Sequence, residues 1–191
     1  MLQMIRNRIA SPFWMPRGLL ARGIPGHRFL MLLLILFLVT AQGLSARGIT
    51  PFQLSLLSPF QLFDRDTAVV GARLNIFYGE NDYVYGVDAG FVNEVEIASG
   101  GVALGAANLS ESHLGVQAGL FNGADSLYGL QIGIANTNDR QFGWQLGLLN
   151  FANDSYLPMV GIGLNDADRA YTGQFTLGIN HLDEGPAIQF A

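Results

Sequence analysis

Few side chains in this chain have types and spacing suited to acid, base or nucleophilic chemistry. Beyond residue 46 the histidines are His113 and His181, which are far apart in sequence. No serine lies in a nucleophile elbow, and neither a phosphate-binding loop nor an HExxH zinc motif occurs. Asp88 is the one acid in the middle of a repeated segment, whereas Glu94 and Glu96 lie at a segment end, where charged side chains are mostly exposed. The sequence therefore predicts no catalytic residues and a protein that is not an enzyme.

Two acid-rich segments raise the possibility of calcium binding. The first contains Glu80, Asn81 and Asp82, and the second contains Asp166 and Asp168. Calcium requires six or more oxygen ligands at matched spacing, and neither segment fits the EF-hand pattern. The chain also has no cysteine, which removes disulfides and thiolate metal sites. We therefore expect solvated turns at both segments, with no metal and no other cofactor.

The most regular feature is a short phrase that returns every 14 or 15 residues, with glycine at its first and fifth places and asparagine at its eighth in most copies. It reads "GxQxGxxN" in the copies from Gly115, Gly129 and Gly143. Two looser copies begin at Pro158 and Gly173, and their second glycine comes one place later, at Gly163 and Gly178. Such a period is typical of repeat architectures. The residues that we assign to the structural repeat are Gly86, Asn93, Gly101, Asn108, Gly115, Asn122, Gly129, Asn136, Gly143 and Asn150.

The repeated amides have two interpretations each. The asparagines could form a ladder that binds a ligand or orders water, but a structural role is favoured, in which each ends a strand and bonds nearby backbone in the following turn. Gln117, Gln131 and Gln145 could line a pore, or they could bond one another inside a packed sheet. Both alternatives for the glutamines stay open at this point.

Within one copy the pattern alternates with a period of two residues. Tyr128, Leu130 and Ile132 point one way, and Gly129 and Gln131 point the other. Alternation over nine residues predicts a β-strand. The segments between copies, such as "GADSL" and "TNDRQ", are small and polar, as expected of turns.

Strand and turn lengths then restrict the architecture. An unbroken nine-residue strand is about 30 Å long, whereas five turn residues reach about 17 Å at most. Successive strands must therefore run antiparallel if they are unbroken. We predict an all-β fold, an up-and-down antiparallel meander of about ten short strands, closed or curled as a barrel to hide its edges. The alternative is a parallel β-solenoid, which requires each copy to bend, most plausibly at a glycine.

The residue types on the two strand faces indicate what surrounds each face. One face is large and apolar, and the other is nearly free of charge. Lipid outside and a tight Gly/Gln lumen inside would explain this, as in an outer-membrane barrel, and so would close stacking of sheets. The short turns count against an outer-membrane barrel, whose outer loops are usually longer. The near-identity of successive copies is unusual for up and down strands and is what a solenoid would show. The lipid interpretation makes outer-membrane lipid the expected partner.

Charge and hydropathy separate the N-terminal segment from the rest. Residues 1–46 contain five arginines and no acid, followed by the apolar run "FLMLLLILFLV" and small residues, which together predict a secretory signal peptide. The remaining residues 47–191 form a single β-repeat domain in this interpretation. They contain five arginines against fifteen acids, a net charge of −10 that disfavours nucleic acid as a partner.

One resemblance covers about residues 51–191. The block "SPFQLFDRDTAVVGARLNIFYGENDYVYGVDAGFVNEV", followed by runs of "GxQxGxxN", resembles an uncharacterised bacterial envelope family described as surface-repeat proteins, whose units read roughly G-L-Q-L-G-L-V-N. The resemblance implies export, a cell-envelope location and no enzymatic activity. We therefore expect a non-enzymatic outer-membrane or cell-surface protein, with a secreted soluble β-repeat binding or structural module as the alternative.

Overall fold

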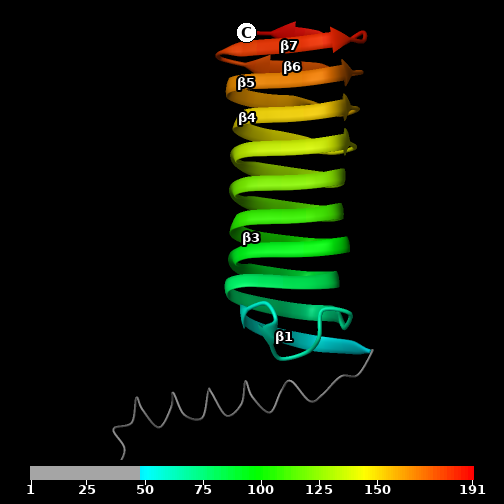
Figure 1. Ribbon diagram of the computed structural model, residues 1–191. Coiled ribbons are helices and arrows are strands. Elements are labelled where there is room, and N and C mark those ends of the chain that lie inside the picture. Colours follow the sequence, from blue (N-terminus) through cyan, green and yellow to red (C-terminus); the bar gives the residue numbers. More distant parts are fainter. Residues whose placement is uncertain (1–47) are drawn as a thin grey trace, which may run out of the picture. The chain divides into compact units, whose positions relative to one another are not determined.

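The 14- to 15-residue repeat forms one coil of a β-solenoid, and coils stack along one axis (Figure 1). The computed structural model describes residues 48–191, which make about nine turns of this solenoid. The predicted signal peptide lies outside the described residues. The strands are β1 (Ile49–Leu57), β2 (Phe60–Gln61), β3 (Ala68–Gln141), β4 (Trp144–Ser155), β5 (Met159–Ala170), β6 (Gly173–Thr176), β7 (Ile179–Glu184) and β8 (Ile188–Phe190).

Successive coils pair in parallel, and the register is continuous except for shifts within the β1–β3 and β4–β5 pairs. Between β3 and β4, Ile132 pairs with Leu146 and Asn136 pairs with Asn150. β1 also pairs with β3 in parallel, as do β4 with β5, and β5 with both β6 and β7. The pair between β1 and β2 is antiparallel. Equivalent positions of successive copies therefore stack above one another along the axis.

The all-β prediction is confirmed, but the antiparallel meander and the barrel are wrong, and the solenoid alternative is correct. The error came from treating each copy as an unbroken strand. Alternation breaks at Leu120 and Phe121, two consecutive residues that are both exposed. A further bend lies at Gly115, whose φ is +135°. With bends at these places the chain returns to its starting position within one copy, so the turn need not span the length of a straight strand.

The first glycine of each copy from Gly71 to Gly143 allows adjacent coils to touch through backbone. A Cβ atom on Gly115 would lie 2.1 Å from the carbonyl oxygen of Gly101, and one on Gly129 would lie 2.0 Å from that of Gly115. Both distances are far inside van der Waals contact, so any larger residue would force the coils apart. These glycines therefore let the backbones of adjacent coils approach closely.

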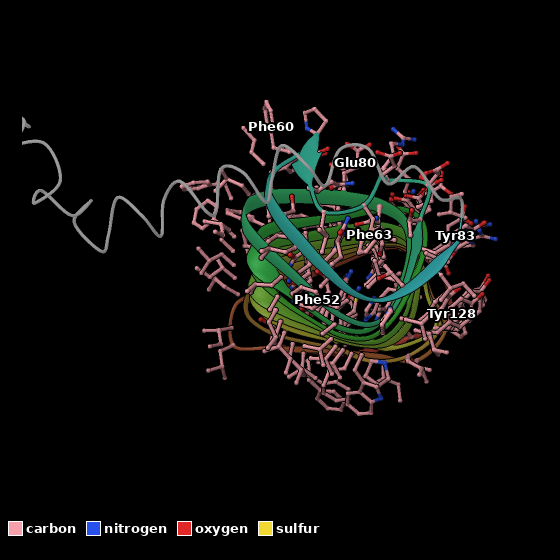
Figure 2. The ribbon with its side chains drawn as sticks, turned by 90° about the horizontal axis from the view of Figure 1, so that it is seen from below. Phe52, Phe60, Phe63, Glu80, Tyr83 and Tyr128 are labelled. Carbon is pink, nitrogen blue, oxygen red and sulfur yellow. The ribbon has the colours of Figure 1, made fainter. Side chains whose placement is uncertain are left out.

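Residues 58–67 close the N-terminal end of the solenoid (Figure 2). The Gln53 amide holds this segment through both of its polar atoms: Nε2 donates to the Phe63 carbonyl at 2.7 Å, and Oε1 accepts from the Phe63 amide at 3.0 Å. Arg65 reaches from the segment to the carboxylates of Glu80 and Glu96. In the part of the chain from residue 48 onward, no helix is long and apolar enough to cross a bilayer.

Candidate functional site

The repeated asparagines form a ladder inside the solenoid. The Nδ2 atom of Asn108 donates to Oδ1 of Asn122 at 2.8 Å, and the same bond joins Asn122 to Asn136 and Asn136 to Asn150, each at 2.9 Å. All four side chains are at most 1% exposed. We call the whole series the asparagine ladder, and its members are Asn75, Asn93, Asn108, Asn122, Asn136, Asn150, Asn165 and Asn180.

From Asn93 to Asn180, each ladder amide also binds a backbone carbonyl of the next coil. Nδ2 of Asn122 donates to the Ile132 carbonyl at 2.9 Å, and Nδ2 of Asn136 donates to the Leu146 carbonyl at 3.0 Å. Both protons of each of these two amides are therefore used between coils. The expectation that asparagine bonds nearby backbone in its own turn is wrong, because in a solenoid the nearest free carbonyl belongs to the next coil. Since the ladder is buried and its donors are taken, it does not present a ligand-binding row to solvent.

The glutamines form a second interior row. Nε2 of Gln131 donates to Oε1 of Gln117 at 2.7 Å, and Nε2 of Gln145 donates to Oε1 of Gln131 at 3.3 Å. Gln131 and Gln145 are 0% exposed. Of the two alternatives for these residues, the packed interior with mutual amide bonds is correct, and the pore is wrong.

Asp88, the mid-segment acid, belongs to a buried ion pair. Arg73 binds it in a bidentate manner, with Nε–Oδ1 and Nη2–Oδ2 distances of 2.8 and 2.6 Å. Nη1 of Arg73 donates to Asn81 Oδ1 and to the Glu94 carbonyl, so the guanidinium is well satisfied. We did not predict this pair from the sequence. The signal was available, because Arg73 and Asp88 occupy the third place of successive copies, and a solenoid stacks equivalent places.

The two histidines lie in different environments and do not act together. His113 is buried, with Nδ1 2.8 Å from Ser99 Oγ and with no hydrogen-bond partner on Nε2. Burial lowers the pKa of His113 to about 4, so its ring is neutral at pH 7. His181 is exposed on the outside of the coil, where the hydrogen bond and charge of Asp166 raise its pKa. Neither environment assembles a catalytic set.

Most of the outward-facing large side chains are apolar. Ile132, Trp144 and Phe121 are 43%, 46% and 56% exposed. They belong to the second and fourth places of each copy and to the corner that follows. We call this surface the apolar side; its exposed members are Leu74, Ile76, Phe77, Val87, Phe91, Val102, Leu104, Leu120, Phe121, Ile132, Ile134, Trp144, Leu148, Ile162, Phe175 and Leu177. A shallow groove of about 380 Å³ runs across it between Ile134, Leu148 and Ile162.

An aromatic ladder flanks the apolar side. Tyr128, Phe142, Tyr156 and Tyr171 stack in four successive coils, with ring centroids 5.1, 4.5 and 4.9 Å apart and planes within 7° of parallel. Tyr128 points away from the coil in Figure 2. Because the ring faces cover one another, the ladder presents ring edges and hydroxyl groups outward, and this does not suit stacking against a flat ligand.

The surface charges gather on a different side of the coil. From residue 68 onward, every charged side chain other than Arg73 and Asp88 comes from the ninth to twelfth places of a copy, counted from its first residue. We call this surface the acidic side; its carboxylates are Glu80, Asp82, Glu94, Glu96, Glu111, Asp125, Asp139, Asp154, Asp166, Asp168, Asp183 and Glu184. Arg140 and Arg169 are the cations among them, and Arg169 pairs with Asp154 at 2.6 Å.

Both acid-rich segments considered for calcium lie on the acidic side. A groove of about 540 Å³ passes between Glu94, Glu111 and Asp139. Among residues 48–191, no three carboxylate, histidine or cysteine side chains are placed to hold one metal ion. Glu80 and Asp82 are instead engaged by Arg65, with Nη1–Oε1 and Nε–Oδ1 distances of 2.7 and 3.6 Å.

Comparison with known proteins returns no match. No protein-family model, no curated protein and no solved structure is similar to this chain. What the protein does is therefore inferred from the division of its surface into an apolar side and an acidic side around a closed polar interior.

Proposed function

We propose that this chain is an exported, non-enzymatic β-solenoid of the bacterial cell envelope, which serves as a structural or binding module at the outer membrane or cell surface. The arginine-rich start and the apolar run of residues 1–46 support export, and the resemblance to surface-repeat proteins supports the envelope location.

One observation carries the non-enzymatic part of the proposal. The repeated polar side chains, which are the natural candidates for chemistry, are committed to the interior ladders and to the Arg73–Asp88 pair. Asn136, for example, is 0% exposed and its amide protons are both donated to the neighbouring coil. Residues used in this way hold coils in register and cannot reach a substrate. The remaining variation between copies lies on the outside, where a binding module would contact its partner.

The acidic side favours a second candidate function. Carboxylates such as Glu111, Asp125 and Asp139 recur at one place in successive coils, so they form a line of negative charge along the axis. A secreted soluble module could use such a line to bind a basic protein segment through charge complementarity. In that case the protein would leave the cell rather than remain with the envelope.

Cysteine labelling of intact cells distinguishes these candidates, because the chain has no cysteine of its own. Thr137 is exposed on the acidic side, and the full chain with Thr137→Cys should react with a membrane-impermeant maleimide in intact cells and should fractionate with the envelope. The unmodified chain is the matched control for background labelling. Labelled protein found only in the culture medium would support the secreted module. Protein protected from the reagent until the cells are lysed, with residues 1–46 still attached, would contradict both candidates.

A further inference from the structure

We propose that the apolar side is a lipid-docking surface. The solenoid lies with its long axis along a membrane, the apolar side enters the outer part of the acyl layer, the aromatic ladder lies at the headgroup boundary, and the acidic side faces water. This inference rests on the envelope function proposed above and names the partner of that function as a lipid surface.

The size of the apolar side is the first argument. About nine coils at ~4.8 Å spacing give a length of roughly 43 Å, and the flat part of each coil spans about five residues, or ~16 Å. The flat part alone therefore covers roughly 700 Å², whereas the largest apolar patch on a typical monomer is about 300–600 Å². Trp144 and Ile132 lie within this flat part, and each exposes more than 40% of its surface. A patch of this size indicates an apolar partner.

The shape of the apolar side decides between lipid and a second copy of the chain. A two-fold interface needs about 800 Å² from each partner, so the flat part is nearly large enough. A flat partner would, however, leave uncovered the corner residues Phe77, Phe121 and Leu148, which are 59%, 56% and 43% exposed. It would also leave the aromatic ladder exposed on the other flank. A fluid acyl layer can follow the surface around both flanks, so lipid fits the observed distribution better.

The aromatic ladder lies at the boundary that this orientation requires. The order of the three surfaces around the coil follows the chain: Arg140 lies on the acidic side, Phe142 in the aromatic ladder and Trp144 on the apolar side. Tyrosine suits a membrane interface because its ring is apolar and its hydroxyl prefers water. Stacking of Tyr156 on Phe142 and Tyr171 turns the outer ring edges toward the surroundings. The ladder therefore marks where the apolar and aqueous environments meet.

The charge distribution limits the depth of docking and predicts its salt dependence. The carboxylates of the acidic side cannot enter the acyl layer, so the solenoid lies in the interface and does not cross the membrane. Among residues 68–191, the exposed arginines are Arg140 and Arg169. This part of the surface therefore has no basic cluster that could attract anionic headgroups. Binding should therefore depend on apolar contact and should not weaken between low and high salt.

Trp144 provides a direct probe, because the chain has two tryptophans and the other, Trp14, lies in the N-terminal segment. In the full chain with Trp14→Phe, we expect Trp144 emission to shift to shorter wavelength on addition of phosphatidylcholine vesicles and to be quenched by acyl-chain-brominated lipid. The matched reporter is Trp14→Phe/Trp144→Phe/Thr137→Trp, which places the only tryptophan on the acidic side. Its emission should not be quenched.

A pair of charge substitutions measures how much the apolar side contributes to binding. Ile132→Asp and Thr137→Asp both change exposed positions, so both variants should fold, as circular dichroism would verify. In the Trp14→Phe chain, quenching of Trp144 by acyl-chain-brominated lipid should weaken at least about tenfold for Ile132→Asp, because a carboxylate must then enter the interface or hold the coil away from it, and less than about twofold for Thr137→Asp. This readout reports on the apolar side and not on lipid binding by the apolar run of residues 1–46.

Three results would overturn the inference. If the chain binds vesicles while Trp144 stays unquenched, attachment occurs elsewhere, and the envelope location would stand without lipid docking of the apolar side. If Trp144 emission shifts without lipid and with rising protein concentration, and the particle mass doubles, a second copy covers the surface. If tryptophans at positions 144 and 137 are quenched equally, the solenoid has no preferred orientation on the membrane.

Discussion

Removing one member of the asparagine ladder should destabilise the solenoid more than its small volume suggests. In Asn136→Ala, three hydrogen bonds are lost: from Asn122 Nδ2 at 2.9 Å, to Asn150 Oδ1 at 2.9 Å and to the Leu146 carbonyl at 3.0 Å. The asparagine side chains are buried and the Leu146 carbonyl is partly buried, and a buried polar group without a partner costs about 1–3 kcal/mol. Because Asn122 and Asn150 each keep other bonds of the ladder, we expect the free energy of unfolding to fall by about 3–5 kcal/mol.

Urea unfolding of the full chain, followed by far-ultraviolet circular dichroism, measures this loss. Hydrogen exchange of the backbone around residues 122 and 150 shows whether the damage stays local, since coils of a solenoid contact mainly their neighbours. Thr137→Ala is the matched control, because this neighbouring residue is exposed and its truncation should change the free energy of unfolding by less than about 0.5 kcal/mol. If Asn136→Ala were as stable as Thr137→Ala, the ladder would not hold the coils together.

Three further perturbations test other parts of the interior. Gly115→Ala should cost more than about 2 kcal/mol in chemical unfolding, because φ is +135° and the new Cβ would meet the Gly101 carbonyl. Gly123→Ala should cost less than about 1 kcal/mol, because its Cβ would meet only the side-chain ends of Leu109 and Thr137. Arg73→Met should cost about 3–5 kcal/mol by leaving a buried carboxylate unpaired, and adding Asp88→Leu should recover much of that loss; no recovery in the double variant would contradict the ion-pair assignment. The pKa of His113 is lowered to about 4 in the folded protein, so protonation favours the unfolded chain, and the free energy of unfolding should fall by up to about 3 kcal/mol as pH drops from about 6.5 to about 4. His113→Leu should flatten that pH dependence, and an unchanged slope would show that other groups cause it.

Much of the local structure could be predicted from the sequence, because the alternation of large and small residues separates the two faces of a strand. The period-two pattern places Ile132 and Gln131 on opposite faces, and in the structure Ile132 lies outside and Gln131 inside. The direction of chain travel could not be predicted in the same way. It depends on bends at residues such as Leu120 and Phe121, where two consecutive apolar residues could equally continue a buried strand. A straight-strand length applied to a bent strand then led to the antiparallel arrangement.

The role of the asparagines could not be predicted from a single copy, for a related reason. Asparagine before a polar segment is typical of a turn, and nothing within one copy shows that Asn122 and Asn136 touch. Only the parallel register brings the Nδ2 atom of one asparagine within 2.8–3.0 Å of the Oδ1 atom of the equivalent asparagine in the next copy. The same register explains the pairing of Arg73 with Asp88. Once the register is known, the recurrence of one amide in every copy predicts a ladder directly.

Disulfide crosslinking tests the parallel stacking most directly, since no native cysteine interferes. Thr137 and Phe151 pair across adjacent coils, so the double variant Thr137→Cys/Phe151→Cys should form an intramolecular disulfide under mild oxidation. An antiparallel hairpin would separate these two positions by about 30 Å, the length of a strand, and would instead bring positions 134 and 144 together. The solenoid therefore predicts a crosslink in the first variant and none in Ile134→Cys/Trp144→Cys. The reverse result would contradict it.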